Sequence, residues 1–468
     1  MVTPKTKKLI QQDKKFIWHP FTQQLDWERD TPLIIESGKG VFLFDTNRKK
    51  YLDGVSSLWV NTFGHQQKKI DAAIKNQLKK MAHSTFLGLT HPPAIELAAK
   101  LGQLAGSPLR RVFYSDNGST AVEIALKMAY QYWQQGANDY HRKKFFTLRN
   151  AYHGDTLGAT SVGGIDLFHQ RFRALLLSNI FLPSPYCYRC PKNKTNIPTL
   201  LLNDIKNFSD YQKARGCAGE CLKKSHEIIK KYHRQIVALI AEGGIQAAAG
   251  MITMPPQYLK ILLEIARGYN LPVIIDEVAT GFGRCGKILA IHRLKIKPDF
   301  LALAKGITGG YLPLAATLTT EKIYRAFLGK YAEFKTFFHG HTYTANPLAA
   351  AAAIANISLL EKSLGQISRK EKLLAELLLP LLNLKHVGDI RHFGLMVGIE
   401  IVRDKKSKNE YGPEKKIGQK ICKQIHKYGI ILRPLGNVIV LMPPLSISEE
   451  ELTELVARTR QAIIDITR

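Results

Sequence analysis

The stretch VIIDEVATGFGRCGK, residues 273–287, decides the fold class because an apolar run leads directly into two acids and a glycine-rich turn. The run ending in Asp276 and Glu277 resembles the magnesium-binding strand of an ATPase. The glycines also spell G-x-G-x-x-G, a dinucleotide-binding pattern, and G-x-x-x-x-G-K, which is most of a P-loop. In a further interpretation, no glycine touches a phosphate and Asp276 is the chemical residue.

Details of the stretch conflict with both nucleotide-binding interpretations. A P-loop requires Ser or Thr after its lysine and precedes the acidic strand, but here Ile288 follows Lys287 and the strand comes first. A dinucleotide fingerprint is followed by an acid at the end of the next strand, whereas Asp299 precedes its strand. We therefore favour Asp276 as the functional residue and expect the glycines to shape a turn.

Apolar runs of strand length recur through the middle of the chain and alternate with stretches of helical periodicity. Strands buried on both faces are continuous apolar runs, and their alternation with helices implies parallel units. We therefore predict an α/β fold with a mostly parallel sheet flanked by helices. Ligands of such sheets bind beyond the carboxyl ends of the strands, where Asp276 and Lys305 lie. The predicted strands are 111–115, 144–148, 236–242, 271–277 and 300–306.

The two ends of the chain differ from this middle part. The first residues alternate apolar and polar side chains around turns, which predicts a small antiparallel unit. After about residue 345, helices rich in alanine and leucine precede two strand-like pieces. We expect a smaller α+β domain built from segments 1–60 and 346–468, with a large domain at 61–345.

The composition is typical of a globular protein with a large core: 468 residues, 45% hydrophobic and 22% charged. The apolar runs are short, and the first residues lack the apolar core of a signal peptide, so we expect a cytoplasmic protein without a membrane segment. The net charge of +29 is scattered along the chain and forms no basic stripe. We therefore expect small-molecule substrates and no nucleic-acid partner.

Lys305 ends the last predicted strand of this series, in the segment PDFLALAKGITGG. A lysine in a partly dry site loses its proton readily and becomes a nucleophilic amine. A lysine with an aspartate partner for a pyridinium nitrogen is the arrangement that a pyridoxal phosphate enzyme needs. The Asp276–Lys305 pair therefore predicts this cofactor.

Three further features suit the same cofactor. Gly118 and Ser119 begin a predicted helix, where free backbone N–H groups can bind a phosphate. Tyr152, in AYHGD, could stack on one face of the pyridine ring, and Val278 could cover the other. Each feature is common by itself, but their joint occurrence in this order favours the cofactor site.

With these residues in place, the chain resembles the class III aminotransferases, which are fold-type I pyridoxal phosphate enzymes. The resemblance runs from about Phe16 to the C-terminus and rests above all on the Asp276–Lys305 pair. It implies a homodimer whose active site is shared between subunits, and a large domain that binds the cofactor. The motifs that carry it are IWHPFTQ, DGVSSLWVNTFGH, THPPAIELAAKL, YSDNGSTAVEIALKMAYQYW, AYHGDTLGATSVG, FFHGHTYTANPLA and ILRPLGNVIVLMPP.

The resemblance also implies roles for individual residues. Lys305 carries the cofactor and moves a proton, Asp276 pairs with the pyridine nitrogen, and Tyr152 stacks on the ring. Arg433 grips a substrate carboxylate, for which a guanidinium is suited. The implied cofactor-binding residues are Gly118, Ser119, Tyr152, Asp276, Val278, Lys305 and, from the neighbouring subunit, His341 and Thr342. The implied substrate-binding residues are Phe21, Leu58, Trp59, Tyr152, Asp155, Arg284, Lys305, Gly340 and Arg433.

Within the family, WHPFTQ and RPLG…LMPP are most similar to the branch that acts in biotin synthesis, which converts 8-amino-7-oxononanoate to 7,8-diaminononanoate. Members of that branch that use S-adenosylmethionine as amino donor typically have Tyr at position 21 and Trp at position 58. Phe21 and Leu58 are more similar to relatives that use L-lysine, so both donors stay open. The alternative is another class III ω-aminotransferase, which acts on a diamine or an ω-amino acid.

Four cysteines lie outside this chemistry. They follow the pattern C-x2-C-x26-C-x3-C, and four thiolates at such spacing can bind zinc tetrahedrally. The gap is longer than usual, and transamination requires no metal, so unpaired thiols are the alternative. We expect no metal in the active site. The four residues are Cys187, Cys190, Cys217 and Cys221.

Overall fold

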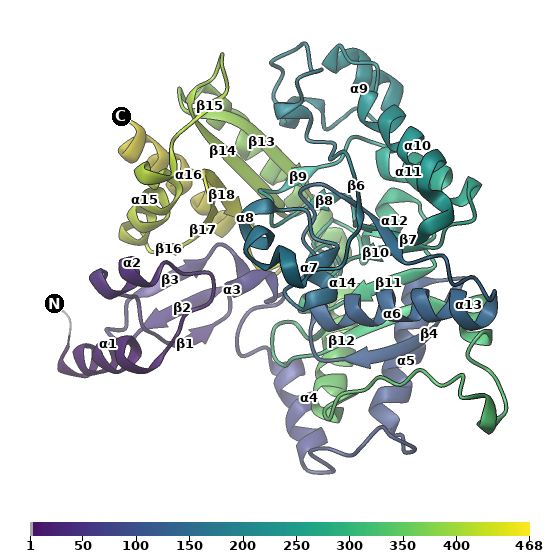
Figure 1. Cartoon of the computed structure of the whole chain (residues 1–468). Coiled ribbons are helices and arrows are strands. Elements are labelled where there is room, and N and C mark those ends of the chain that lie inside the picture. The colour runs from purple at the N-terminus through teal and green to yellow at the C-terminus, as the bar shows by residue number, and fades with distance from the viewer. Residues whose placement is uncertain (1–2) are drawn as a thin grey trace.

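The computed structural model describes residues 3–468, and its centre is a seven-stranded sheet (Figure 1). The strand order is β4-β12-β11-β10-β7-β5-β6. Strand β12 runs antiparallel to both neighbours, and the other adjacent pairs are parallel, so the predicted α/β fold is confirmed. The strands are β4 (Leu109–Ser115), β5 (Lys144–Leu148), β6 (Ile180–Leu182), β7 (Ile236–Glu242), β10 (Val273–Asp276), β11 (Phe300–Leu303) and β12 (Ala315–Thr320).

The middle strands β7, β10 and β11 are buried along their whole length, as their continuous apolar sequences predict. Alternate residues of β10 face two separate cores. Ile274 packs in the cluster beneath α6, whereas Val273 and Ile275 pack in the larger cluster that includes α11. Because β7, β10 and β11 are parallel neighbours, their carboxyl ends lie at one edge of the sheet.

Helices cover both faces of this sheet (Figure 1). Helix α6 packs on β7, β11 and β12, and α11 packs on β10. The helices of this part are α4 (Lys68–Leu78), α5 (Pro92–Ala105), α6 (Gly118–Gly136), α7 (Leu157–Ser161), α8 (Asp166–His169), α9 (Phe208–Arg215), α10 (Glu220–Tyr232), α11 (Tyr258–Gly268), α12 (Ala290–Leu294) and α13 (Glu321–Arg325).

Segments from the two ends of the chain share a sheet. N-terminal β3 pairs in parallel with C-terminal β16, and the strands of this sheet have the order β1-β2-β3-β16. A further sheet has the order β13-β14-β18-β17, and β15 pairs with β14. The pairing of β3 with β16 is in line with a small domain from both termini, whose boundaries stay a prediction. The remaining strands are β1 (Ile35–Lys39), β2 (Phe42–Asp45), β3 (Lys50–Asp53), β8 (Ile245–Gln246), β9 (Ile252–Thr253), β13 (Val387–Phe393), β14 (Met396–Asp404), β15 (Asn409–Glu410), β16 (Ile430–Ile431), β17 (Arg433–Leu435) and β18 (Val438–Leu441). The remaining helices are α1 (Pro4–Phe16), α2 (Gln24–Arg29), α3 (Ser56–Trp59), α14 (Pro347–Leu378), α15 (Ile417–Gln424) and α16 (Glu449–Thr467).

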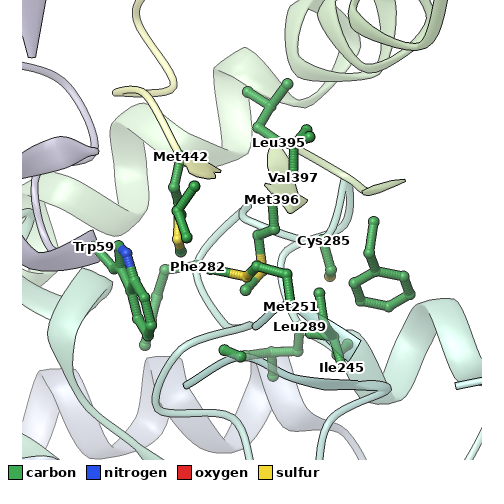
Figure 2. Close-up of a cluster of buried hydrophobic side chains, with 14 of the residues drawn as sticks. Trp59, Ile245, Met251, Phe282, Cys285, Leu289, Leu395, Met396, Val397 and Met442 are labelled. Carbon is green, nitrogen blue, oxygen red and sulfur yellow. The ribbon is translucent and has the colours of Figure 1, made fainter. Parts of the chain in front are cut away.

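The glycine-rich loop after β10 is part of the core where these segments meet (Figure 2). Trp59, Phe282 and Met442 lie in this cluster, and Phe282 is fully buried. Gly283 has a left-handed φ of +93°, and a Cβ there would lie 2.7 Å from a methyl carbon of Leu360. The loop therefore requires glycine for a turn packed inside the protein, and the similarity to a P-loop is coincidental.

Helix α14 is the longest helix of the described chain, at 32 residues. Together with the turn that follows, 347–383, it is long and apolar enough to cross a membrane, with a mean hydropathy of 1.2. It packs against α4, α5 and α16, and its Ala350, Ile357 and Leu374 are fully buried. A core helix of a globular protein passes the same length test, and this packing agrees with that assignment.

Burial of His392, in β13, predicts that the free energy of unfolding depends on pH. Burial lowers its pKa to about 4, against about 6.5 for a free histidine. Below pH 6.5 the unfolded chain gains a proton that the folded chain does not take up until about pH 4. The contribution of His392 to the free energy of unfolding is therefore fully present above pH 6.5. It falls by about 3 kcal/mol as the pH drops to about 4.

The measurement is the thermal unfolding midpoint of His392→Leu and of the parent between pH 7 and pH 4.5. We expect the variant to lose less stability over this interval. His141→Leu, at an exposed position, is the matched control and should follow the parent. Equal pH slopes for parent and His392→Leu would contradict the prediction.

Candidate active site

Lys305 is the first residue of a 3-10 turn (Lys305–Thr308) that begins just after β11. Its φ of +47° is left-handed, which is unfavourable for a residue with a side chain. Burial is the main cause that lowers the pKa of its amine, and the charges of Asp276 and Glu242 act in the opposite direction. Its Nζ lies 4.7 Å from the centre of the Trp59 ring. A lowered pKa increases the share of neutral, nucleophilic amine.

Asp276 is buried at the end of β10, and both of its carboxylate oxygens have partners. Oδ2 lies 2.8 Å from His153 Nδ1, and Oδ1 accepts a hydrogen bond from the backbone N–H of Val278 at 2.9 Å. The His153 side chain is buried, and its Nε2 has no hydrogen-bond partner in the described chain. The carboxylate is thus held in one orientation by His153, which our sequence analysis missed although it lies within the AYHGD motif.

Glu242, at the end of β7, is a second residue that the sequence analysis missed. It lies in register with Asp276 on the neighbouring strand. Its carboxyl accepts backbone hydrogen bonds from Tyr152 at 3.2 Å and Ala247 at 2.9 Å. Its pKa is raised well above the ordinary value, mainly by burial and secondly by the charge of Asp276. The sequence did contain a signal for Glu242, because an acid ends the predicted strand 236–242. The sequence does not give the strand order, however, which places this acid beside Asp276.

Tyr152 gathers several of the predicted substrate-binding residues. Its hydroxyl donates a hydrogen bond to Asp155 Oδ2 at 2.8 Å. Burial raises the pKa of that hydroxyl, and the nearby charge of Arg433 on β17 acts to lower it. The Phe168 ring lies 6.1 Å from the Tyr152 ring and 5.4 Å from the Phe21 ring. Asp155 therefore contacts Tyr152 directly, Phe21 approaches it through Phe168, and Arg433 is near enough for its charge to act on the hydroxyl.

The start of α6 forms a cradle beside this group. The Asn117 side chain caps the N–H of Thr120, and the first N–H groups of a helix have no partner within it. A Cβ on Gly118 would lie 2.5 Å from a methyl carbon of Val278. The Ser119 hydroxyl bonds to Thr156 Oγ1 at 2.7 Å and ties the helix to the Tyr152 loop. The close approach of Gly118 to Val278 explains why glycine is required here.

The predicted segment 340–342 lies near the same helix start. His341 Nδ1 is 2.7 Å from Oδ2 of Asp116, two residues before Gly118. Gly340 is loosely surrounded, since the nearest atom to a Cβ there would be 3.8 Å away. Thr342 is exposed. That His341 and Thr342 serve a neighbouring subunit stays a prediction.

Two predicted substrate-binding residues, Arg284 and Leu58, differ in burial. Arg284 is 1% exposed and donates hydrogen bonds to the main-chain oxygens of Pro443 at 2.5 Å and Asn61 at 2.7 Å. Burial lowers its pKa to about 9. These hydrogen bonds tie the loop after β10 to Asn61 and to the C-terminal segment, and a role of Arg284 in substrate binding stays a prediction. Leu58 is 48% exposed, in contrast to buried Trp59.

Residues other than glycine with a left-handed backbone are frequent around the site. Such strain persists only where the surrounding structure enforces it, and it is commonest at functional sites. The members of this group near the site are Phe21, Ser56, Ser57, Trp59, Phe282 and Lys305.

The residues present fit pyridoxal phosphate. They supply an amine of lowered pKa on Lys305, an oriented carboxylate on Asp276, an aromatic ring on Tyr152 and a helix N-terminus at Gly118. Bound there, pyridoxal phosphate supplies an electron-accepting ring that carries an amino group from one substrate to another. The fold and this arrangement define a fold-type I pyridoxal phosphate enzyme.

Comparison with known proteins supports this class and narrows it. The family described as Aminotransferase class-III matches residues 24–463, so the chain belongs to the class III aminotransferases and is a pyridoxal phosphate-dependent enzyme. Adenosylmethionine-8-amino-7-oxononanoate aminotransferase of Anoxybacillus flavithermus is 48% identical, covering 98% of this chain and 97% of that protein. The protein of the same name from Geobacter sulfurreducens is 45% identical, covering 99% and 98%.

Solved structures of aminotransferases have the same fold as this chain. Adenosylmethionine-8-amino-7-oxononanoate aminotransferase from Methanocaldococcus jannaschii has a TM-score of 0.90 and 43% identity, covering 99% of this chain and 100% of that chain. An (S)-enantioselective ω-transaminase from Thermomicrobium roseum has a TM-score of 0.89 and 32% identity, covering 99% of both chains. The fold is therefore common to aminotransferases of different specificity.

The cradle leads to a prediction for Gly118→Ala. The added methyl group would meet Val278, so either that side chain or the helix start must shift. We expect the affinity for pyridoxal phosphate to fall by about 1–3 kcal/mol, which is about 5- to 150-fold in dissociation constant. The measurement is a titration of the cofactor-free protein with pyridoxal phosphate, followed by visible absorbance.

The matched control is Gly365→Ala, within α14, where a Cβ would meet no atom within 4 Å. This variant should keep the parent affinity, because alanine is favourable in a helix interior. Unchanged affinity in Gly118→Ala would show that the helix start is not part of the cofactor site.

Proposed function

We propose that this aminotransferase acts in biotin synthesis in the cytoplasm and transfers an amino group to 8-amino-7-oxononanoate, giving 7,8-diaminononanoate. The observation that carries the proposal is the near full-length similarity, at 45–48% identity, to two proteins that bear the name of this activity. The WHPFTQ and RPLG…LMPP motifs of the sequence support it. We also propose that the enzyme is a homodimer with a shared active site.

In this proposal, Lys305 carries the cofactor and its Nζ takes and returns the proton of the substrate carbon that bears the amino group. Burial favours its neutral form, which is the form that can take a proton. Asp276 holds the protonated pyridine nitrogen, and His153 keeps the carboxylate facing it. Tyr152 and Val278 would hold the two faces of the ring. The helix start at Gly118 binds the phosphate.

Arg433 binds the substrate carboxylate in this proposal. It is partly exposed on β17, so its guanidinium can meet a ligand. Its charge acts on the Tyr152 hydroxyl, which places it near the ring-stacking residue. A planar fork of N–H donors binds a carboxylate through two parallel hydrogen bonds. The carboxylate of 8-amino-7-oxononanoate is far from its keto group along the chain, which requires such an anchor away from Lys305.

The amino donor is either S-adenosylmethionine or L-lysine. The names of the similar proteins favour S-adenosylmethionine. Phe21 lacks the hydroxyl, and Leu58 the large flat surface, that members using S-adenosylmethionine typically have at these positions. Both side chains are more than 45% exposed and so are accessible to a donor.

The first experiment is a half-reaction. The cofactor-loaded enzyme is mixed with S-adenosylmethionine or with L-lysine, and the visible absorbance of the cofactor is followed. Loss of absorbance with one donor, reversed by 8-amino-7-oxononanoate, would support the proposed step and identify the donor. If another ω-amine were the only one to bleach the enzyme, the biotin step would be rejected in favour of an ω-aminotransferase, the class of the Thermomicrobium roseum neighbour.

A double variant, Phe21→Tyr with Leu58→Trp, tests whether these two positions set the donor. We expect the ratio of half-reaction rates to shift towards S-adenosylmethionine. Leu89→Trp, at a similarly exposed position, is the control and should leave the ratio unchanged. An unchanged ratio in the double variant would assign donor choice to other residues.

A further inference from the structure

Four free cysteines from two separate segments line one cavity, away from the residues of the active site. Cys187 opens the short turn 187–189 and Cys190 follows it, while Cys217 and Cys221 flank the start of α10. The cavity has a volume of about 30 Å³, enough for a single ion or water molecule. In Figure 1, α9 and α10 lie at the periphery of the molecule. The chain has thus folded so that its C-x2-C and C-x3-C pairs face each other.

A buried cation lines the same cavity. Arg215 is 1% exposed and donates hydrogen bonds to the Tyr211 hydroxyl, the Thr199 hydroxyl and the Ile197 carbonyl. Across residues 3–468, no ion pair joins this guanidinium directly to a carboxylate. A buried charge without a counter-charge is costly. Arg215 and all four cysteines line this one cavity, so the guanidinium lies close to the thiols.

The turn that carries the first cysteine pair is anchored on both sides. The N–H of Cys190 donates to the Cys187 carbonyl at 3.3 Å, and Arg189, between them, forms ion pairs with Glu400 of β14 and Glu410 of β15. Tyr188 is 3% exposed. Arg189 therefore fixes this turn beside β14 and β15, and a cross-link to α10 would join these C-terminal strands to that helix.

We propose that Cys187, Cys190, Cys217 and Cys221 bind one divalent thiophilic cation, Zn²⁺, as a structural site. The four S–H groups release their protons to solvent, and the four sulfurs bind the ion tetrahedrally at about 2.3 Å. The resulting centre has a net charge of −2, because four thiolates surround one Zn²⁺. Arg215 supplies a positive charge beside it. No electron transfer is involved.

In this structure the four thiols line the cavity without converging on a common point. Within the described part of the chain, no three His, Cys, Asp or Glu side chains form a ready metal-binding group. Rotation of the cysteine side chains into the cavity would be needed to complete the site. Metal binding and local ordering are therefore expected to be coupled.

The experiment measures zinc and pyridoxal phosphate per chain in full-length enzyme purified without chelators from zinc-supplemented cells. We expect about one zinc ion per chain. The double variant Cys217→Ser with Cys221→Ser should lose at least about 90% of it, since two ligands rarely retain zinc during purification. Cys422→Ser, a buried cysteine elsewhere, is the matched control and should retain zinc. The inference is independent of the proposed function, because pyridoxal phosphate content and half-reaction are measured separately.

A second measurement uses the parent enzyme and keeps the proposal testable if the double variant does not fold. The parent enzyme is treated with a chelator, titrated with Co²⁺, and examined for the thiolate-to-metal absorption of a tetrahedral cobalt site, which added Zn²⁺ should remove. Absence of zinc in the purified parent together with absence of this cobalt signal would overturn the proposal. Zinc that persists unchanged in the double variant would also overturn it, because the ion would then be bound elsewhere.

Discussion

Lys305→Ala is expected to lower the rate of transamination by at least about 10⁴-fold, the upper range for loss of a general acid–base group, because in the proposed function the same amine also carries the cofactor. The side chain lies just beyond the carboxyl end of β11, and burial lowers the pKa of its amine. The measurement is the single-turnover half-reaction with the preferred donor. The visible absorbance of the cofactor-loaded protein should also change, because the covalent link is lost.

Lys287→Ala is the matched control. Lys287 is exposed at the end of the loop after β10, so its replacement should leave both the rate and the spectrum close to those of the parent. Retention of more than about 1% of the parent rate in Lys305→Ala would reject Lys305 as the catalytic lysine, since a lost acid–base group costs at least about 10²-fold.

Asp276→Asn is expected to lower kcat/KM by about 10²- to 10³-fold, which is the usual cost of removing one preorganised electrostatic contact. Asparagine is close to aspartate in size and can keep the contacts with His153 and the Val278 N–H. It has no negative charge, however, so it cannot hold a protonated pyridine nitrogen. The measurement is steady-state kinetics together with cofactor content.

Two controls separate this electrostatic effect from loss of structure. Asp299→Asn changes a partly buried carboxyl, which accepts a hydrogen bond from the Val273 N–H, and should retain most activity. Reconstitution of Asp276→Asn with a pyridoxal phosphate analogue methylated at the ring nitrogen supplies a fixed positive charge and should restore part of the rate. Failure of this rescue with normal analogue binding would contradict the assigned role of Asp276.

The strand pattern was predictable because each middle strand is a continuous apolar run. The predicted strands 144–148 and 236–242 match β5 and β7. β10 and β11 end before the predicted limits, and Lys305 begins the next turn instead of ending the strand. The difference arises because backbone hydrogen bonding ends a strand where its neighbour diverges, which local sequence does not report.

The sequence by itself determined that Asp276 and Lys305 lie at the carboxyl ends of buried parallel strands, because hydrophobic periodicity is a local property. Only the tertiary structure decided their partners. The His153–Asp276 contact joins residues 123 positions apart, and Glu242 reaches the site through strand order. The burial of Arg284 and the shared cavity of the four cysteines likewise result from contacts between distant segments. Contacts between distant segments depend on register and packing, which are set by the whole chain at once.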